Sequence, residues 1–195
     1  MQKLVVATGN PGKLNEMQEY LTGLPWELEL KPKELDIEET GTTFVANARL
    51  KASEVAKALG KWSIADDSGL AVNALDGAPG LYSSRYGKTD EDRIGRLLRE
   101  LGNTEDRKAK FICAIAIANH ECKIDLQTEC ICAGEILTSP SGNGGFGYDP
   151  VFYVPGEDQT FAEMSPETKS RISHRGIAFA QLMPEFKKLT ANRHG

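Results

Sequence analysis

The segment 66-DDSG-69 places two adjacent carboxylates at the carboxyl end of a short apolar run, 62-WSIA-65. Carboxylate and hydroxyl oxygens suit a hard cation such as Mg²⁺, and a second carboxylate can orient a water molecule. Adjacent side chains of an extended chain point to opposite faces, so Asp66 and Asp67 are not expected to bind one ion together. The alternative is an Asx-turn that closes a strand, and the segment alone leaves both interpretations open.

A second candidate, 8-TGNPGK-13, lies between a predicted strand, 3-KLVVA-7, and a predicted helix. Backbone N–H groups at the start of a helix attract phosphate, and Lys13 would add a positive charge. The glycine spacing matches neither a Walker loop nor a dinucleotide-binding fingerprint. The alternative is an ordinary strand-to-helix turn that carries a surface lysine.

Two later segments carry aromatic and basic residues, 146-FGYDP-150 and 169-KSRISHR-175. Aromatic rings flanked by glycines are costly to expose, so they are expected either to anchor the loop on the core or to stack on a ligand. Asp149 could accept a hydrogen bond from the edge of a base. The basic residues of the second segment are either a solvated helix start or contacts to phosphate, with an arginine able to stack on a base.

Caps and apolar periodicity predict the elements that position these residues. Asn10 is the predicted N-cap of the first helix, and Pro11 its first residue. Further helices are predicted at 43–59, after Thr89, after Ser165 and after 173-SHRG-176; strands are predicted at 26–30, 62–65 and 151–154, with a hairpin formed by 108–118 and 122–136. This order predicts an α/β fold with mixed strand directions.

The 195 residues suit one large domain or two small lobes. An excess of 28 acidic over 23 basic residues argues against broad binding to nucleic acids or acidic membranes. No apolar run approaches the ~20 residues of a membrane span, and no signal peptide is recognised, which predicts a soluble intracellular protein. The four cysteines are expected to be small buried hydrophobic residues in a reducing cytosol rather than metal ligands.

The order of six motifs closely resembles the inosine triphosphate pyrophosphatase family over nearly the whole chain. The motifs are 8-TGNPGK-13, 39-ETGTTF-44 with 47-NARLKA-52, 66-DDSGL-70, 77-GAPGLYSSRY-86, 144-GGFGYDPVF-152 and 173-SHRG-176. The resemblance implies a single domain over 1–195, with an elongated mixed β-sheet flanked by helices and two lobes with a substrate cleft between them. It implies a cytoplasmic homodimer that hydrolyses inosine, deoxyinosine or xanthosine triphosphate, with Mg²⁺, to the monophosphate and pyrophosphate.

The same resemblance assigns the site residues. Asp67 matches the catalytic, metal-binding aspartate, and Glu38 matches a second metal carboxylate. Glu39 and Asp66 remain alternatives, because Ala46 stands where many members carry a glutamate. The implied substrate contacts are Thr8, Gly9, Asn10, Pro11, Gly12, Lys13, Ser68, Phe146, Gly147, Tyr148, Asp149, Lys169, His174 and Arg175.

For selectivity, we expect Phe146 and Arg175 to enclose the purine ring, while donors from the 146–149 backbone and His174 face its 6-oxo group. Inosine triphosphate should then be hydrolysed far faster than ATP or GTP. Two alternatives are a related pyrophosphatase for modified pyrimidine nucleotides and a nucleotide sensor without turnover. The adjacent carboxylates argue against the sensor, since they repel a triphosphate unless a metal intervenes.

Overall fold

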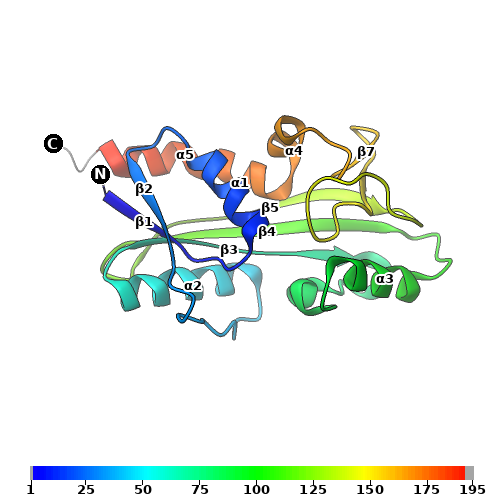
Figure 1. Ribbon diagram of the computed structural model, residues 1–195, viewed down its shortest axis with the longest axis horizontal. Helices are drawn as coiled ribbons and strands as arrows, with labels where there is room; N and C mark the ends of the chain where they lie inside the picture. The colour runs from blue at the N-terminus through cyan, green and yellow to red at the C-terminus, as the bar shows by residue number, and fades with distance from the viewer. Residues whose placement is uncertain (1, 192–195) are drawn as a thin grey trace. The chain divides into compact units, whose positions relative to one another are not determined.

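The computed structural model describes residues 2–191, whose helices and strands alternate in the early part of the chain (Figure 1). The strands are β1 Gln2–Val6, β2 Trp26–Leu30, β3 Trp62–Val72, β4 Lys108–Ala118, β5 Ile124–Ile136, β6 Phe152–Val154 and β7 Gln159–Thr160. The helices are α1 Pro11–Leu21, α2 Phe44–Leu59, α3 Asp90–Leu101, α4 Pro166–Ile172 and α5 His174–Ala191, with short 3₁₀ helices at Asn73–Leu75 and Gly80–Arg85.

The strands form one sheet in the order β2-β1-β3-β4-β5-β6-β7. β1 pairs in parallel with both β2 and β3, whereas β6 pairs antiparallel with β5 and β7. The mixed sheet flanked by helices that the sequence predicts is therefore confirmed.

The chain divides into two compact units. Unit 1 comprises Met1–Asp67, Cys113–Cys130 and Arg175–Gly195, and unit 2 comprises Ser68–Ile112 and Ile131–His174. The boundary thus falls between Asp67 and Ser68, inside β3. The single domain and the cleft between two lobes stay predictions.

In unit 1, α1 and α5 cover one face of the strands and α2 covers the other (Figure 1). Trp62 and Ile64 of β3 belong to the core that packs against α1 and α5, which contribute Met17 and Phe179. Because side chains alternate along a strand, odd-numbered residues of this part of β3 face α2. Whether a residue of β3 has an odd or an even number therefore decides which helix its side chain faces.

In unit 2, the core is built from α3 and a group of aromatic rings. Phe111 contacts Phe152 and Phe161, at centroid distances of 4.6 and 5.7 Å. Thr89 caps α3 as predicted, and its side chain and that of Asp92 form a reciprocal capping box. This box fixes where α3 begins, next to the loop that carries Phe146.

The predicted helix starts are confirmed at Asn10, Thr43 and Ser165, each of which accepts a hydrogen bond from a backbone N–H of its helix. Gly60 ends α2 with a φ of 63°, a left-handed conformation that favours glycine. The prediction of a short strand at 62–65 is wrong, because β3 continues to Val72.

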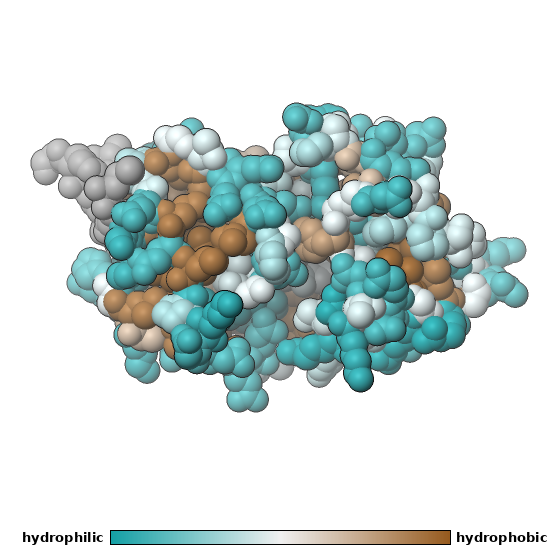
Figure 2. All heavy atoms as spheres, viewed as in Figure 1, coloured by the Kyte–Doolittle hydropathy of each residue, from teal (hydrophilic) through white to brown (hydrophobic). Residues whose placement is uncertain are grey.

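The cysteines are free thiols, and three of them, Cys113, Cys130 and Cys132, are buried as predicted. Cys122 differs, because it lies partly exposed in the turn between β4 and β5 with a φ of 67°. Hydrophobic residues also reach the surface: Figure 2 shows them gathered over β2, the edge strand, where Leu30 is 51% exposed. Within the described chain, no helix is long and apolar enough to cross a membrane.

Candidate active site

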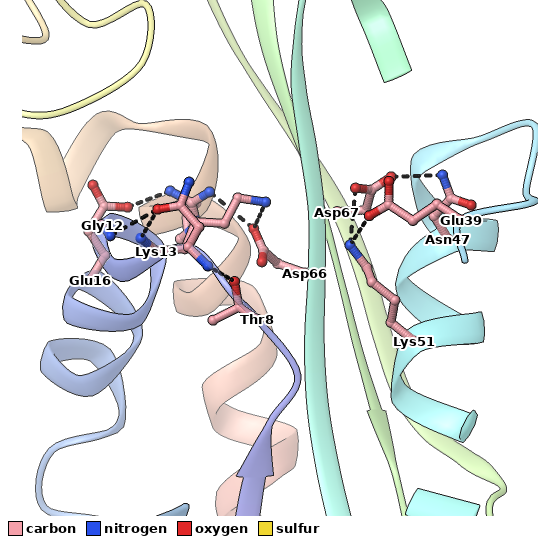
Figure 3. A network of polar contacts seen from close by, with 11 residues as sticks. Thr8, Gly12, Lys13, Glu16, Glu39, Asn47, Lys51, Asp66 and Asp67 are labelled. Atoms are coloured by element: carbon pink, nitrogen blue, oxygen red, sulfur yellow. Dashed lines mark hydrogen bonds and ion pairs between the residues drawn. The ribbon is translucent and has the colours of Figure 1, made fainter. Parts of the chain in front are cut away.

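Asp66 and Asp67 lie inside β3 and point to opposite faces of it, as their adjacent positions predict (Figure 3). They do not end a strand, so both the strand-end position and the turn interpretation are wrong. A strand tolerates two buried carboxylates here because each has cationic partners on a covering helix. Asp66 meets α1 and α5, and Asp67 meets α2.

The Asp66 side chain is fully buried and contacts both Lys13 of α1 and Arg175 of α5. Its Oδ2 atom lies 3.0 Å from Lys13 Nζ and 3.0 Å from Arg175 Nη2. The other terminal nitrogen of Arg175 bonds to Glu16 of α1. This ionic network orients Lys13 and Arg175, and Arg175 is buried rather than part of a solvated helix start.

The pKa of Asp66 reflects a contest between burial and positive charge. Burial by itself would raise the pKa, but the charges of Lys13, Arg175 and Lys51 outweigh burial and hold it well below its usual value. Asp66 therefore stays ionised, which suits an orienting residue rather than a proton acceptor.

Asp67 faces α2, where Asn47 and Lys51 lie one helical turn apart on the same side. Its Oδ2 atom accepts a hydrogen bond from Asn47 Nδ2 at 3.1 Å, and its Oδ1 atom accepts one from Lys51 Nζ at 3.2 Å. Lys51 Nζ also donates to Glu39 Oε1 at 2.7 Å. One ammonium thus holds two carboxylates near each other (Figure 3).

The pKa of Asp67 is raised, opposite to that of Asp66. Burial is the main cause and the negative charge of Glu39 adds to it, while Lys51 opposes both. Burial lowers the pKa of Lys51, but Asp67, Asp66 and Glu39 together raise it above its usual value. Asp67 is therefore the more basic of the two aspartates and the better proton acceptor.

The oxygens of Asp67 and Glu39 fit a hard divalent cation. Both carboxylates already hold the same ammonium, so they can approach a common positive charge. Glu38 is exposed, whereas its neighbour Glu39 is half-buried and makes this contact, which favours the alternative left open at Glu39. Across residues 2–191, no group of three or more His, Cys, Asp or Glu side chains could hold a metal ion. Mg²⁺ typically binds through one or two carboxylates and completes its shell with water and phosphate.

In the predicted phosphate-binding segment 8–13, the first backbone N–H groups of α1 are already bonded to the N-cap, Asn10. Asn10 Oδ1 accepts hydrogen bonds from the backbone N–H groups of Gly12 and Lys13, at 2.9 and 3.2 Å. Thr8 Oγ1 accepts one from Asn10 N at 3.1 Å. The expectation that loop N–H groups point at phosphate therefore requires Asn10 to release them. A side chain at Gly9 would meet no atom within 4 Å, so packing does not require glycine there.

The charges of the two networks do not balance. Three cationic side chains, Lys13, Lys51 and Arg175, face four carboxylates, those of Glu16, Glu39, Asp66 and Asp67. One negative charge is in excess before any ligand binds. A triphosphate would therefore be repelled unless a cation accompanies it.

In unit 2, the loop after Gly145 is organised around the buried carboxylate of Asp149. Its Oδ2 atom accepts hydrogen bonds from Phe146 N at 2.8 Å and from Lys169 Nζ at 2.7 Å. Lys169 Nζ lies 4.9 Å from the centroid of the Phe146 ring. These contacts bring together three of the predicted substrate contacts: Phe146 and Asp149 of the predicted base-binding loop, and Lys169.

Other predicted contacts are placed differently. The Tyr148 ring is buried in the core and its hydroxyl donates to Ser83 O at 2.9 Å. His174 is buried and stacks on Phe111 at 4.6 Å with an interplanar angle of 9°. Ser68 follows Asp67 on β3 and is partly buried. Arg175 belongs to unit 1 and Phe146 to unit 2. The expectation that these two side chains enclose the purine ring therefore stays a prediction.

Sequence reasoning missed Glu16, Asn47 and Lys51. Asn47 and Lys51 stand four residues apart beside the apolar stripe of α2, and polar residues at that spacing share a helix face. That spacing is visible in 47-NARLKA-52 and could have marked them as partners of Asp67. Glu16 offers no comparable sign, because its partner Arg175 is distant in sequence.

The Asp66 network is expected to stabilise the fold. Asp66→Asn should lower the free energy of unfolding by about 3 kcal/mol, because it leaves Lys13 and Arg175 without their buried counter-charge. Glu185→Gln, which breaks an exposed pair with Lys188 in the same unit, should cost less than about 0.5 kcal/mol. Urea unfolding of the two variants measures both. Equal losses would show that Asp66 contributes no more than a surface pair.

A family model described as the Ham1 family matches residues 4–185, and the chain belongs to that family. A relative from Nostoc sp. named dITP/XTP pyrophosphatase is 61% identical over 189 residues, which cover 97% of this chain and 96% of the relative. A relative of the same name from Synechocystis sp. is 57% identical over 189 residues, 97% of each chain. The solved structure of a HAM1 protein from Coxiella burnetii is similar, with a TM-score of 0.85 and 43% identity, and the match covers 98% of this chain and 100% of that one. The family resemblance seen in the motifs is confirmed.

Proposed function

We propose that this protein is a nucleoside triphosphate pyrophosphatase that hydrolyses deaminated purine nucleotides such as deoxyinosine and xanthosine triphosphates. The close relatives that carry the name dITP/XTP pyrophosphatase support this activity. The observation that carries it is the pair of networks on β3, where Lys13 and Arg175 meet Asp66 while Asp67 and Glu39 share Lys51. Charges of both signs around a strand suit a triphosphate bound together with a metal ion.

Unit 1 binds the triphosphate in this proposal. Lys13 and Lys51 supply ammonium groups, and the α1 N-terminus supplies a partial positive charge once Asn10 turns aside. The open space at Gly9 lets the backbone approach a phosphate closely. Asp66 keeps the Lys13 ammonium oriented, because it stays ionised inside β3.

Asp67 and Glu39 hold Mg²⁺ in this proposal. When bound, the metal neutralises phosphate charge and polarises the phosphoryl group. The excess negative charge among the side chains supports the requirement for a divalent cation. Glu39 replaces the earlier choice of Glu38, because Glu39 is the residue that shares Lys51 with Asp67.

Asp67 orients the attacking water and accepts its proton. The water oxygen forms a bond to the α-phosphorus, the bond from that phosphorus to the bridging oxygen breaks, and pyrophosphate leaves. Asn47 Nδ2, which donates to Asp67 Oδ2, holds the carboxylate in one rotamer during this step.

Unit 2 recognises the base, through Phe146 stacking and through polar groups around Asp149 and Lys169. Phe146 N and Gly147 N each carry one hydrogen, which they donate to Asp149 and Asp90. The Lys169 ammonium also donates to Asp149 but carries three hydrogens, so it is the better candidate donor to a 6-oxo group. A cytoplasmic location and a homodimer complete the proposal, and light scattering of the purified protein tests the dimer.

The activity is tested by hydrolysis of inosine triphosphate in ¹⁸O-labelled water with Mg²⁺. We expect inosine monophosphate and pyrophosphate, with the label in the monophosphate, because water attacks the α-phosphorus. Excess chelator should stop the reaction. Label in orthophosphate would refute this cleavage position, and binding without product would favour a sensor. Faster hydrolysis of modified pyrimidine triphosphates would favour the related pyrophosphatase.

A further inference from the structure

The 142–147 loop, which the proposed function assigns to base recognition, has one packed side and one side that faces a cavity. Gly142 and Gly144 lie close against Ala162 and Glu163. On the other side, a cavity of about 490 Å³ that is open to solvent lies between part of α3 and the loop, and Ile94, Leu98 and Phe146 are among its lining residues. Side chains do not fill the space between the loop and α3, so hydrogen bonds contribute to holding the loop beside that helix.

The loop also has little intrinsic stiffness. The stretch 142-GNGGFG-147 contains four glycines, three of them, Gly142, Gly145 and Gly147, with positive φ. Glycine loses more conformational freedom on ordering than any other residue, so such a loop needs anchors to hold one conformation. Gly144 N donates to Ala162 O at 3.0 Å, which fixes the start of the loop.

Asp90 is the anchor at the other end. Its Oδ2 atom accepts a hydrogen bond from Gly147 N at 2.7 Å, and its Oδ1 atom pairs with Arg93 one turn along α3 at 2.5 Å. Asp90 is the first residue of α3, and the Thr89 capping box fixes that position. A carboxylate held from two sides on a rigid helix thus reaches the backbone next to Phe146.

We propose that Asp90 is a positioning residue that sets base selectivity by fixing the Phe146 loop beside this cavity. The inference rests on the proposed function, because it gives the loop its role in reading the base. Without the Asp90 carboxylate, the loop can move into the cavity. Phe146 and the neighbouring Lys169 then no longer present one fixed arrangement to the 6-oxo group. Discrimination between bases falls more than the rate of phosphate cleavage does.

The test compares Asp90→Ala and Asp90→Asn with Asp92→Ala. Asp90→Ala removes the acceptor, and the ratio of kcat/KM for inosine triphosphate to that for ATP should fall about tenfold, mainly through KM. Asp90→Asn keeps an acceptor oxygen and should stay within about threefold of the parent. Asp92→Ala removes only the hydrogen bond from Thr89 N to the Asp92 side chain, while Thr89 Oγ1 still accepts from Asp92 N and keeps the start of α3 in place. It should therefore lower stability slightly without changing the ratio.

A second measurement separates anchoring from general destabilisation. Hydrogen exchange of the Gly147 amide should accelerate about tenfold in Asp90→Ala and stay near the parent rate in Asp92→Ala. If the parent enzyme is selective but Asp90→Ala leaves the ratio unchanged, the anchoring role of Asp90 is refuted and the proposed function is not affected. An equal fall in Asp92→Ala would also overturn it, because helix stability would then be the cause. A parent that does not distinguish the two nucleotides would refute the proposed function instead.

Discussion

Asp67→Asn is expected to lower kcat for inosine triphosphate by about 10³-fold or more, with the fold intact. The substitution keeps the size of the side chain but removes the negative charge that holds the metal and accepts the proton from water. It also turns one oxygen that accepts from Lys51 or Asn47 into a donor. Steady-state kinetics measure the rate, calorimetric titration with Mg²⁺ measures the metal affinity, and circular dichroism checks the fold.

Asp125→Asn provides a matched control for this result. Asp125 lies in the same unit and its Oδ1 atom also accepts a hydrogen bond from an asparagine, Asn119 Nδ2, at 2.9 Å. It is remote from Asp67 in the β4–β5 hairpin, so its substitution should change kcat by less than about twofold. If a folded Asp67→Asn enzyme keeps a kcat within tenfold of the parent, Asp67 is not the catalytic residue.

Local rules predicted the positions of the two aspartates relative to the sheet. Strand parity placed Asp66 and Asp67 on opposite faces. The Asn10 cap and the apolar periodicity of 43–59 placed two of the helices that supply their partners. These predictions depend only on neighbours in sequence, which is why they hold. The motif order then identified the family, which no single motif did.

The length of β3 could not be predicted because two adjacent carboxylates are unusual inside a buried strand. What makes them acceptable is the presence of Lys13, Arg175 and Lys51, and these come from three different helices. Only the tertiary structure shows that the charges are paired. The local pattern therefore favoured an end to the strand that the fold does not have.

The sequence could not decide between Glu38 and Glu39 for a different reason. Residues 31–43 form no helix or strand, so no periodicity indicates which of two neighbouring side chains faces the site. The basic run at 169–175 left two interpretations open, and the burial of His174 and Arg175 argues against a solvated helix start for those two residues. Their partners, Glu16 and Phe111, are far away in sequence.

Inosine triphosphate is expected to be hydrolysed with a kcat/KM about 10³- to 10⁴-fold higher than ATP, because a buried polar site strongly rejects a ligand with the wrong hydrogen-bonding edge. The 6-oxo group of hypoxanthine accepts a hydrogen bond, whereas adenine carries an amino donor at that position. Lys169 Nζ, held at 2.7 Å from Asp149 Oδ2 and beside the Phe146 ring, is a donor that an amino group would oppose. Two donors that face each other in a buried site form no hydrogen bond with one another, so the adenine amino group gains nothing from this contact.

Lys169→Met should therefore lower this ratio to about 10² or less, mostly by reducing kcat/KM for inosine triphosphate. Methionine keeps an unbranched apolar stem beside Phe146 and removes the ammonium. Arg171→Met, on the same helix but in an exposed pair with Glu157, should leave the ratio within about twofold of the parent. Competition assays with both triphosphates in one reaction measure the ratio directly. If the parent hydrolyses the two nucleotides with comparable efficiency, recognition of the base edge is refuted. If the ratio is unchanged in a folded Lys169→Met enzyme, the donor is another group, because this substitution removes the ammonium.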